Sequence, residues 1–178
     1  MGELLLDTTY LLPAFGIGLE LDDFGKTFSR ILGEHTVLYN PVSLIEAKWT
    51  VLRMCRNEPG LRRSLLERYR LGLRATLGDE RLKQTALTDE TVERTADSLL
   101  VENGVRDYFD RTIYATACAR NCILLTEDRE LRGLKAAGGA PRPRRVLDWR
   151  RLGSSSPGGG SGQASVRRPS AAPQSQFI

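Results

Sequence analysis

The sequence of 178 residues lacks the features that would place it in or across a membrane. No apolar run approaches the roughly 20 residues that span a bilayer. No basic residues precede the apolar stretch at positions 4–6, so a secretory signal is not expected either. We therefore expect a cytoplasmic protein without a membrane partner.

Histidine and cysteine, the soft metal ligands, are scarce. His35 is the single histidine, and the three cysteines are an odd number in a chain without a recognisable export signal. This favours reduced thiols over disulfides. Cys118 and Cys122 lie four residues apart with no further soft ligand beside them, so we expect core thiols and no structural zinc site.

Positive charge is scarce at the start of the chain. The first 47 residues contain seven acidic and only two basic side chains, although the whole chain carries a net charge of +4. This asymmetry is compatible with an acidic site beside a basic surface that binds a polyanion. Solvated helix faces and a basic tail would explain it equally well.

Short apolar runs alternate with segments of helical periodicity, and 40% of the residues are hydrophobic. This pattern predicts one α/β domain, a three-layer α/β/α sandwich with a mostly parallel sheet of four or five strands. The expected strands lie within 3–7, 35–41, 122–128 and 144–149, and the expected helices within 41–57, 60–77, 88–100 and 107–121.

The composition changes abruptly near residue 153. Glycine, serine, proline and arginine dominate from there to the end, so we expect a domain over residues 1–152 and a disordered tail over 153–178. The "GGGSG" stretch in this tail is either native or a cloning linker.

Four acidic residues lie where an open parallel sheet binds its ligands, outside the carboxyl ends of the strands. Asp7 and Asp128 follow the first and third expected strands, Glu46 lies in the helix after the second, and Asp110 lies near the start of the helix before the third. Clustered carboxylates repel one another unless a cation is present. Oxygen ligands of this kind select Mg²⁺ or Mn²⁺, which suits metal-assisted hydrolysis of phosphodiesters.

Each of these acids also has a structural interpretation. Asp7 and Asp128 are well placed to cap helices. Glu46 is harder to explain in this way, because an acid beside the apolar helical positions Ile45 and Trp49 is costly to bury. We interpret Trp49 itself as a packing residue.

The four acids resemble, in order and context, those of the PIN domain family, which includes the VapC-type toxins. The likeness covers about residues 3–149. The stretch "DRTIYATACARNCILLTEDREL" is similar to the family's C-terminal signature and contains Asp110 and Asp128. "LLLDTTYLL" resembles its opening strand with Asp7, and "PVSLIEAKWTVL" resembles the helix that carries Glu46.

The resemblance implies a ribonuclease that depends on Mg²⁺ or Mn²⁺ bound by these four catalytic acids. It assigns supporting hydroxyls to Thr8 and Thr126, although many members have Ser or Asn after the first acid. Asp107, one helical turn before Asp110, is either an accessory ligand or the third acid in a shifted register. For a toxin, the resemblance also implies an antitoxin protein and a homodimer.

A basic stretch between residues 48 and 74 is a candidate RNA-binding face. Solvated helices would explain its arginines nearly as well. The residues that we expect to contact RNA are Arg53, Arg56, Arg62 and Arg63.

Two other functions fit the same fold. One is a PIN-like module that binds RNA or protein without catalysis. The other is a Mg²⁺-dependent phosphatase or phospho-receiver, which Thr9 disfavours because it stands where a phosphatase needs a second acid.

Overall fold

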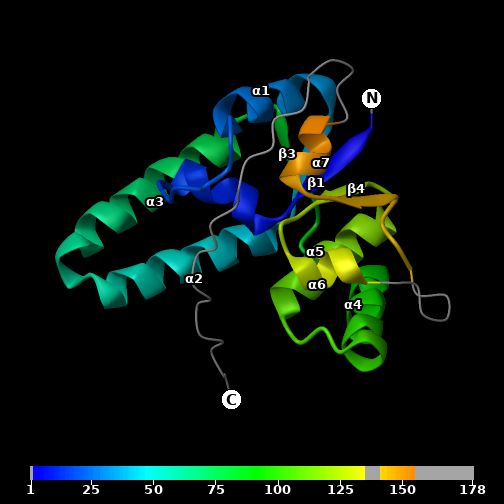
Figure 1. The fold of residues 1–178 in the computed structure, drawn as a ribbon. Helices are drawn as coiled ribbons and strands as arrows, with labels where there is room; N and C mark the ends of the chain where they lie inside the picture. Colours follow the sequence, from blue (N-terminus) through cyan, green and yellow to red (C-terminus); the bar gives the residue numbers. More distant parts are fainter. Residues whose placement is uncertain (1, 135–140, 155–178) are drawn as a thin grey trace, which may run out of the picture.

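The computed structural model describes residues 2–134 and 141–154. The polypeptide alternates between strands and helices along most of this length (Figure 1). In chain order the elements are β1 (Glu3–Leu6), η1 (Thr8–Phe15), α1 (Phe24–Glu34), β2 (Thr36–Tyr39), α2 (Pro41–Asn57), η2 (Pro59–Leu61), α3 (Arg62–Gly78), β3 (Leu82–Gln84), α4 (Glu90–Asn103), α5 (Tyr108–Ala119), β4 (Ile123–Leu125), α6 (Arg129–Gly133), β5 (Arg145–Leu147) and α7 (Trp149–Ser154).

The five strands form one sheet in the order β3-β2-β1-β4-β5, and every neighbouring pair is parallel. At the centre, Leu5 of β1 pairs with Leu38 of β2 on one side and with Leu124 of β4 on the other. The expected parallel sheet is confirmed. Two elements were not expected from the sequence: strand β3, which forms one edge of the sheet, and helix α1, which packs on one of its faces.

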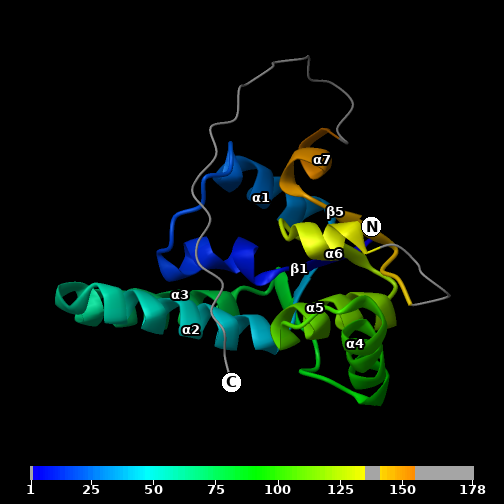
Figure 2. The same ribbon diagram turned by 60° about the horizontal axis from the view of Figure 1, so that its bottom comes forward.

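Helices cover both faces of the sheet, as expected for a three-layer sandwich (Figure 2). Leu4 and Leu6 of β1 point into a core shared with η1, α1, α2, α3 and α7. Leu5 points to the other face, where α4, α5 and α6 supply the packing side chains. This alternation follows from the two-residue period of a strand, and all three leucines are fully buried.

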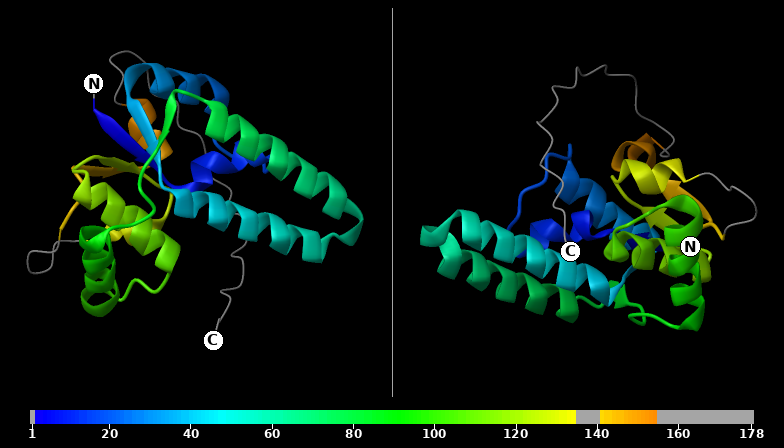
Figure 3. Two further views of the ribbon diagram at one scale, coloured as in Figure 1. Left: turned by 180° about the vertical axis from the view of Figure 1, so that it is seen from behind. Right: turned by 90° about the horizontal axis from the view of Figure 1, so that it is seen from below.

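Helices α2 and α3 form a long antiparallel hairpin that projects beyond the sheet (Figure 3). Gly72 allows α3 to lie against η1, because a Cβ atom at this position would come within 2.1 Å of the Ala14 carbonyl oxygen. The same packing stacks Phe15 on Tyr69 with ring centroids 5.0 Å apart. The lack of a side chain at position 72 therefore allows η1 to pack closely against α3.

Apart from its first two residues, the tail expected over 153–178 lies outside the described residues. Within the described ranges, every helix is too short or too polar to cross a bilayer.

Candidate active site

Asp7 lies at the carboxyl edge of the sheet, directly after the last residue of β1. Its backbone N–H continues the ladder by donating to the Leu125 carbonyl at 3.0 Å, so the residue is held where β1 and β4 end. The side chain is 5% exposed and caps η1 by accepting from the Thr8 N–H at 2.6 Å. The capping interpretation of Asp7 is therefore correct, and it is compatible with a second role.

Thr8 connects the first two predicted acids. In addition to the N–H contact with Asp7, its hydroxyl donates to Oε2 of Glu46 at 2.5 Å. Glu46 reaches this point because Asn40 caps α2, accepting from the Val42 N–H at 2.8 Å, and thereby starts the helix at the end of β2. One threonine thus holds carboxylates from two different elements.

Thr126 makes the corresponding connection to the fourth acid. Its buried hydroxyl donates to Oδ2 of Asp7 at 2.6 Å and accepts from the Asp128 N–H at 3.0 Å. Asp128 in turn caps α6 by accepting from the Leu131 N–H at 2.8 Å. The sequence placed supporting hydroxyls at positions 8 and 126, and in the structure both contact the acids.

Three of the four acids have raised pKa values, and burial is the largest cause in each case. The pKa of Asp7 rises to about 6, with smaller contributions from the charges of Asp128 and Glu127. The pKa of Glu46 rises to about 7, and the charge of Asp7 adds to the effect of burial.

Asp110 has the most strongly perturbed of these carboxyl groups. Burial raises its pKa to about 8, and the charges of Asp107, Asp7, Glu46 and Asp128 add to the increase in that order. The four predicted acids therefore interact electrostatically although they come from four separate segments. A nearby cation would oppose the repulsion between these acids and favour their ionised forms.

Asp107 and Asp110 occupy different positions on α5. Asp107 is the exposed N-cap of the helix and accepts from the N–H groups of Phe109 and Asp110 at 2.8 and 3.3 Å. Asp110 is partly buried one turn further along and interacts with the other acids. This placement favours Asp110 over Asp107 as the member of the acidic cluster.

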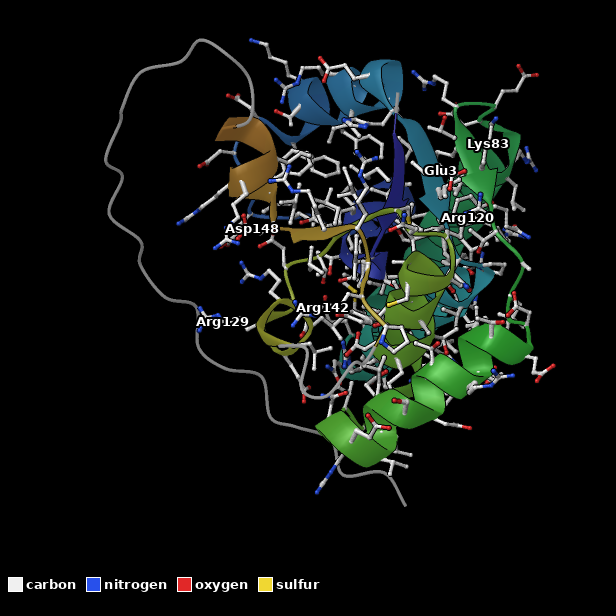
Figure 4. All side chains as sticks on the ribbon, turned by 90° about the vertical axis from the view of Figure 1, so that its right-hand side faces the viewer. Glu3, Lys83, Arg120, Arg129, Arg142 and Asp148 are labelled. Atoms are coloured by element: carbon white, nitrogen blue, oxygen red, sulfur yellow. The ribbon has the colours of Figure 1, made fainter. Side chains whose placement is uncertain are left out.

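The contrast with Asp148 distinguishes the cluster from other acids at the same edge. Asp148 follows β5 as Asp7 follows β1, yet it forms an ion pair with Arg132 and also accepts from the Arg151 N–H at 2.9 Å. At the opposite end of β1, Glu3 pairs with Arg120 at 2.7 Å (Figure 4). In the described parts of the chain, none of the four clustered acids has such an ion pair.

The donor set fits a hard divalent cation, because it consists only of carboxylate and hydroxyl oxygens. One oxygen of Glu46, one of Asp128 and both of Asp110 lack a hydrogen-bond partner among the described residues. Within the same residues, no three acid, histidine or cysteine side chains already stand together in a metal-binding arrangement. The carboxylates would therefore have to turn toward a shared ion.

Two residues that organise this edge were not recognised in the sequence. Asn40 is fully buried and donates to Thr116 Oγ1 at 2.9 Å and to the Leu87 carbonyl at 3.0 Å. Glu127 accepts from the Tyr10 hydroxyl at 2.6 Å and from the Trp149 N–H at 2.9 Å. The position of Asn40 between a strand and a proline was the available signal, whereas the partners of Glu127 are far apart in sequence.

The interpretation of Trp49 as a packing residue is wrong. It is 55% exposed, and its neighbours Ile45 and Leu52 are 45% and 41% exposed. The buried side of α2 instead carries Ala47 and Val51. Helical spacing located the helix correctly, but α2 projects beyond the sheet and leaves one of its apolar stripes in solvent.

The four arginines expected to bind RNA all lie on the exposed surface of the hairpin: Arg53, Arg56, Arg62 and Arg63. The positive charge of Arg53 is the one that acts on the acidic cluster, because it lowers the pKa of Glu46 against the larger effect of burial. Arg62 is held at the end of the hairpin by donating from Nε to the Cys55 carbonyl at 2.8 Å.

The chain is an all-parallel α/β sandwich with unpaired acids at the carboxyl edge of its central strands, and comparisons with known proteins identify its family. The model of the PIN domain matches residues 4–137, more than half of the chain. The chain therefore belongs to the PIN domain family, whose members are generally nucleases.

Solved structures share this fold at low sequence identity. A chain of VapBC2 from Rickettsia felis, solved with a DNA fragment from its promoter, is 14% identical with a TM-score of 0.56, over 83% of this chain and 98% of that one. PAE2754 from Pyrobaculum aerophilum is also 14% identical, with a TM-score of 0.55 over 86% and 97%. No curated protein matches the sequence.

Proposed function

We propose that this protein is an endoribonuclease that depends on Mg²⁺ or Mn²⁺ and hydrolyses RNA phosphodiester bonds. The observation that carries the proposal is that Asp7, Glu46 and Asp128 each act electrostatically on Asp110. Three of these four acids have raised pKa values, and none forms an ion pair among the described residues. Membership of the PIN domain family supports the same chemistry.

In this proposal the four acids hold the cation, and the two threonines orient them. Thr8 fixes Asp7 relative to Glu46, and Thr126 fixes Asp7 relative to Asp128. A divalent ion held by these acids would supply Lewis-acid chemistry, namely polarisation of a phosphoryl oxygen and a lower pKa for a water molecule. Burial of Asp7 keeps its carboxylate dry and so strengthens its interaction with a cation.

The test is cleavage of RNA by purified protein in Mn²⁺ or Mg²⁺, with and without a chelator. Wild type and Asp148→Asn should cleave, because Asp148 is an edge acid outside the cluster, whereas Asp7→Asn and Asp128→Asn should leave the RNA intact. Equal amounts of intact RNA with wild type and with both cluster variants would refute catalysis at this site.

A second candidate function is a module that binds RNA or protein without catalysis. It is favoured by the absence, within the described residues, of a preassembled group of three metal ligands. Calorimetric titration with Mn²⁺ separates the two candidates. A nuclease should bind Mn²⁺, and Asp110→Asn should abolish that binding. A scaffold should show no Mn²⁺ binding that depends on Asp110.

We also propose that the protein is the toxin of a toxin–antitoxin pair, acting as a homodimer and controlled by a small antitoxin protein. Support comes from the structural likeness to a chain of VapBC2. A reading frame beside its gene should encode a protein that abolishes RNA cleavage when the two are purified together. Full cleavage in the presence of that neighbour, or the lack of any such frame, would contradict the toxin role.

A further inference from the structure

The exposed side of α2 carries an indole and two guanidinium groups next to the acidic cluster. Trp49, Arg53 and Arg56 follow Glu46 at positions i+3, i+7 and i+10, so helical periodicity places all four on one side of the helix. Trp49 is 55% exposed. The positive charge of Arg53 lowers the pKa of Glu46, which places this stripe beside the cluster electrostatically.

A groove of about 500 Å³ begins at this stripe and runs toward the end of the hairpin. Its lining comprises Trp49, Leu52, Arg56, Arg62 and two buried or partly buried side chains of α2 and α3, with no acid among them. None of the ion pairs among the described residues involves Arg56 or Arg62. The groove is therefore mostly apolar, and the guanidinium groups of Arg56 and Arg62 at its lining have no acidic partner among the described residues.

This combination fits a nucleotide better than an apolar helix. Single-stranded nucleic acids are bound by aromatic side chains on which bases stack, together with arginines that contact the backbone. A purely apolar partner would leave the two guanidinium groups without a counter-charge, whereas a phosphate would supply one to each. The hydrocarbon stem of an arginine also lies readily beside a base.

We propose that Trp49 is a base-stacking platform and that Arg56 and Arg62, which line the groove, together with Arg53 on the same stripe of α2 hold the adjoining phosphates, so that the groove is a subsite for one unpaired nucleotide of a single-stranded RNA. The choice of RNA as the ligand rests on the proposed nuclease function. The subsite lies next to Glu46 and holds the strand beside the scissile bond. It makes the enzyme selective for single-stranded over double-stranded RNA.

Binding is measured with a chelator present, so that no cleavage occurs, by titrating the protein with a short single-stranded oligoadenylate. Affinity is read for every variant from the fluorescence anisotropy of an end-labelled oligoadenylate. Because Trp149 is only 6% exposed, quenching of tryptophan fluorescence in the wild type additionally reports mainly on Trp49. Trp49→Ala should weaken binding about tenfold or more. Trp49→Phe should retain most of the affinity, because it keeps an aromatic face.

Two controls separate stacking from a general apolar effect. Leu71→Ala removes a side chain that is 54% exposed on the same hairpin and should leave affinity unchanged. An oligonucleotide without bases should bind wild type and Trp49→Ala equally, because it offers nothing to stack.

Equal affinity of wild type and Trp49→Ala for the intact oligoadenylate would overturn the subsite. So would a change in the solution mass of Trp49→Ala at unchanged RNA affinity, which would assign the groove to a second copy of the chain. Cleavage is scored separately with metal present. If Trp49→Ala loses affinity for RNA, the subsite is supported even when no cleavage is found. If the wild type cleaves RNA and Trp49→Ala binds it as tightly as the wild type, the subsite is refuted and the nuclease function is not.

Discussion

Removing the negative charge of Asp7 should stabilise the protein when no metal is present, and this is the sharpest test of the proposed site. Burial raises the pKa of Asp7 from 3.8 to about 6. At pH 7.5 the carboxylate is ionised in both the folded and the unfolded state, so the folded state bears the full cost. This difference in pKa between the folded and the unfolded state corresponds to a loss of about 3 kcal/mol in folding stability.

Asp7→Asn removes the charge and retains part of the hydrogen bonding. The amide oxygen can still accept from the Thr8 N–H, but its NH₂ group faces the Thr126 hydroxyl, which already accepts from Asp128. Rearranging that contact costs about 1 kcal/mol. The net gain is about 2 kcal/mol, which raises Tm by about 4–8 °C for a chain of this size.

A divalent cation should reverse the order of stability. Binding at 100 times Kd stabilises the wild type by about 2.7 kcal/mol, whereas a variant without the first acid gains little. Thermal unfolding followed by circular dichroism, with a chelator and then with Mn²⁺, measures both shifts. Lowering the pH toward 5 should shrink the advantage of Asp7→Asn in the chelator, because the wild-type carboxyl group then becomes protonated in the folded state.

Asp148→Asn is the matched control. Asp148 also follows a strand and is buried, but its charge is paired with Arg132. Its substitution should lower Tm both with and without metal, because it leaves the arginine unpaired. A lower Tm for Asp7→Asn in the chelator, or equal shifts by Mn²⁺ in wild type and Asp7→Asn, would refute the reasoning.

Three further predictions concern pH, a supporting hydroxyl and the packing of the hairpin. With a chelator present, Tm should fall as the pH rises from 5.5 to 8. The folded state keeps Glu46 and Asp110 protonated up to pKa values of about 7 and 8, whereas both are already ionised in the unfolded state. A Tm that rises over this range would contradict these values. Thr126→Val should lower the free energy of unfolding in urea by about 1–3 kcal/mol and reduce cleavage, because Asp7 Oδ2 and the Asp128 N–H lose their hydrogen-bond partner. Thr126→Ser keeps the hydroxyl and should restore both stability and cleavage. Gly72→Ala should destabilise the protein by about 1–3 kcal/mol, because its Cβ would meet a carbonyl oxygen of η1 at 2.1 Å. Gly78→Ala has open space around it and should not destabilise the protein. Equal Tm values for the two variants would refute this packing.

The sequence predicted the sheet well where strands are fully buried and poorly where they are not. The central leucine runs of β1 and β4 are recognisable because both of their faces lie in the core. Strand β3 has only three residues, and its single leucine, Leu82, is partly buried, so no apolar run marks it. Helix α1 contains Gly25 and Gly33, which lower helix propensity.

The position of Asp7 and Asp128 at one edge of the sheet was predictable because topology decides where strands end. Once Asp7 and Asp128 follow parallel strands, they must share an edge of the sheet. The hydrogen bonds of Thr8 and Thr126 and the electrostatic interaction of Asp110 with the other acids depend on how helices pack over that edge. The exposure of Trp49 likewise depends on how far α2 extends beyond the sheet, which helical spacing does not encode.

Asp7 and Asp148 have the same local role and opposite consequences for stability. Both follow a strand and both accept a backbone N–H near the start of a helix. Arg132 neutralises the second, whereas burial raises the pKa of the first and the charges of nearby acids add to the increase. An arginine within the fold would remove this cost, so the unpaired Asp7 is consistent with the cation site proposed above. The distribution of unpaired charge, more than the number of acids, therefore marks this part of the edge as the candidate active site.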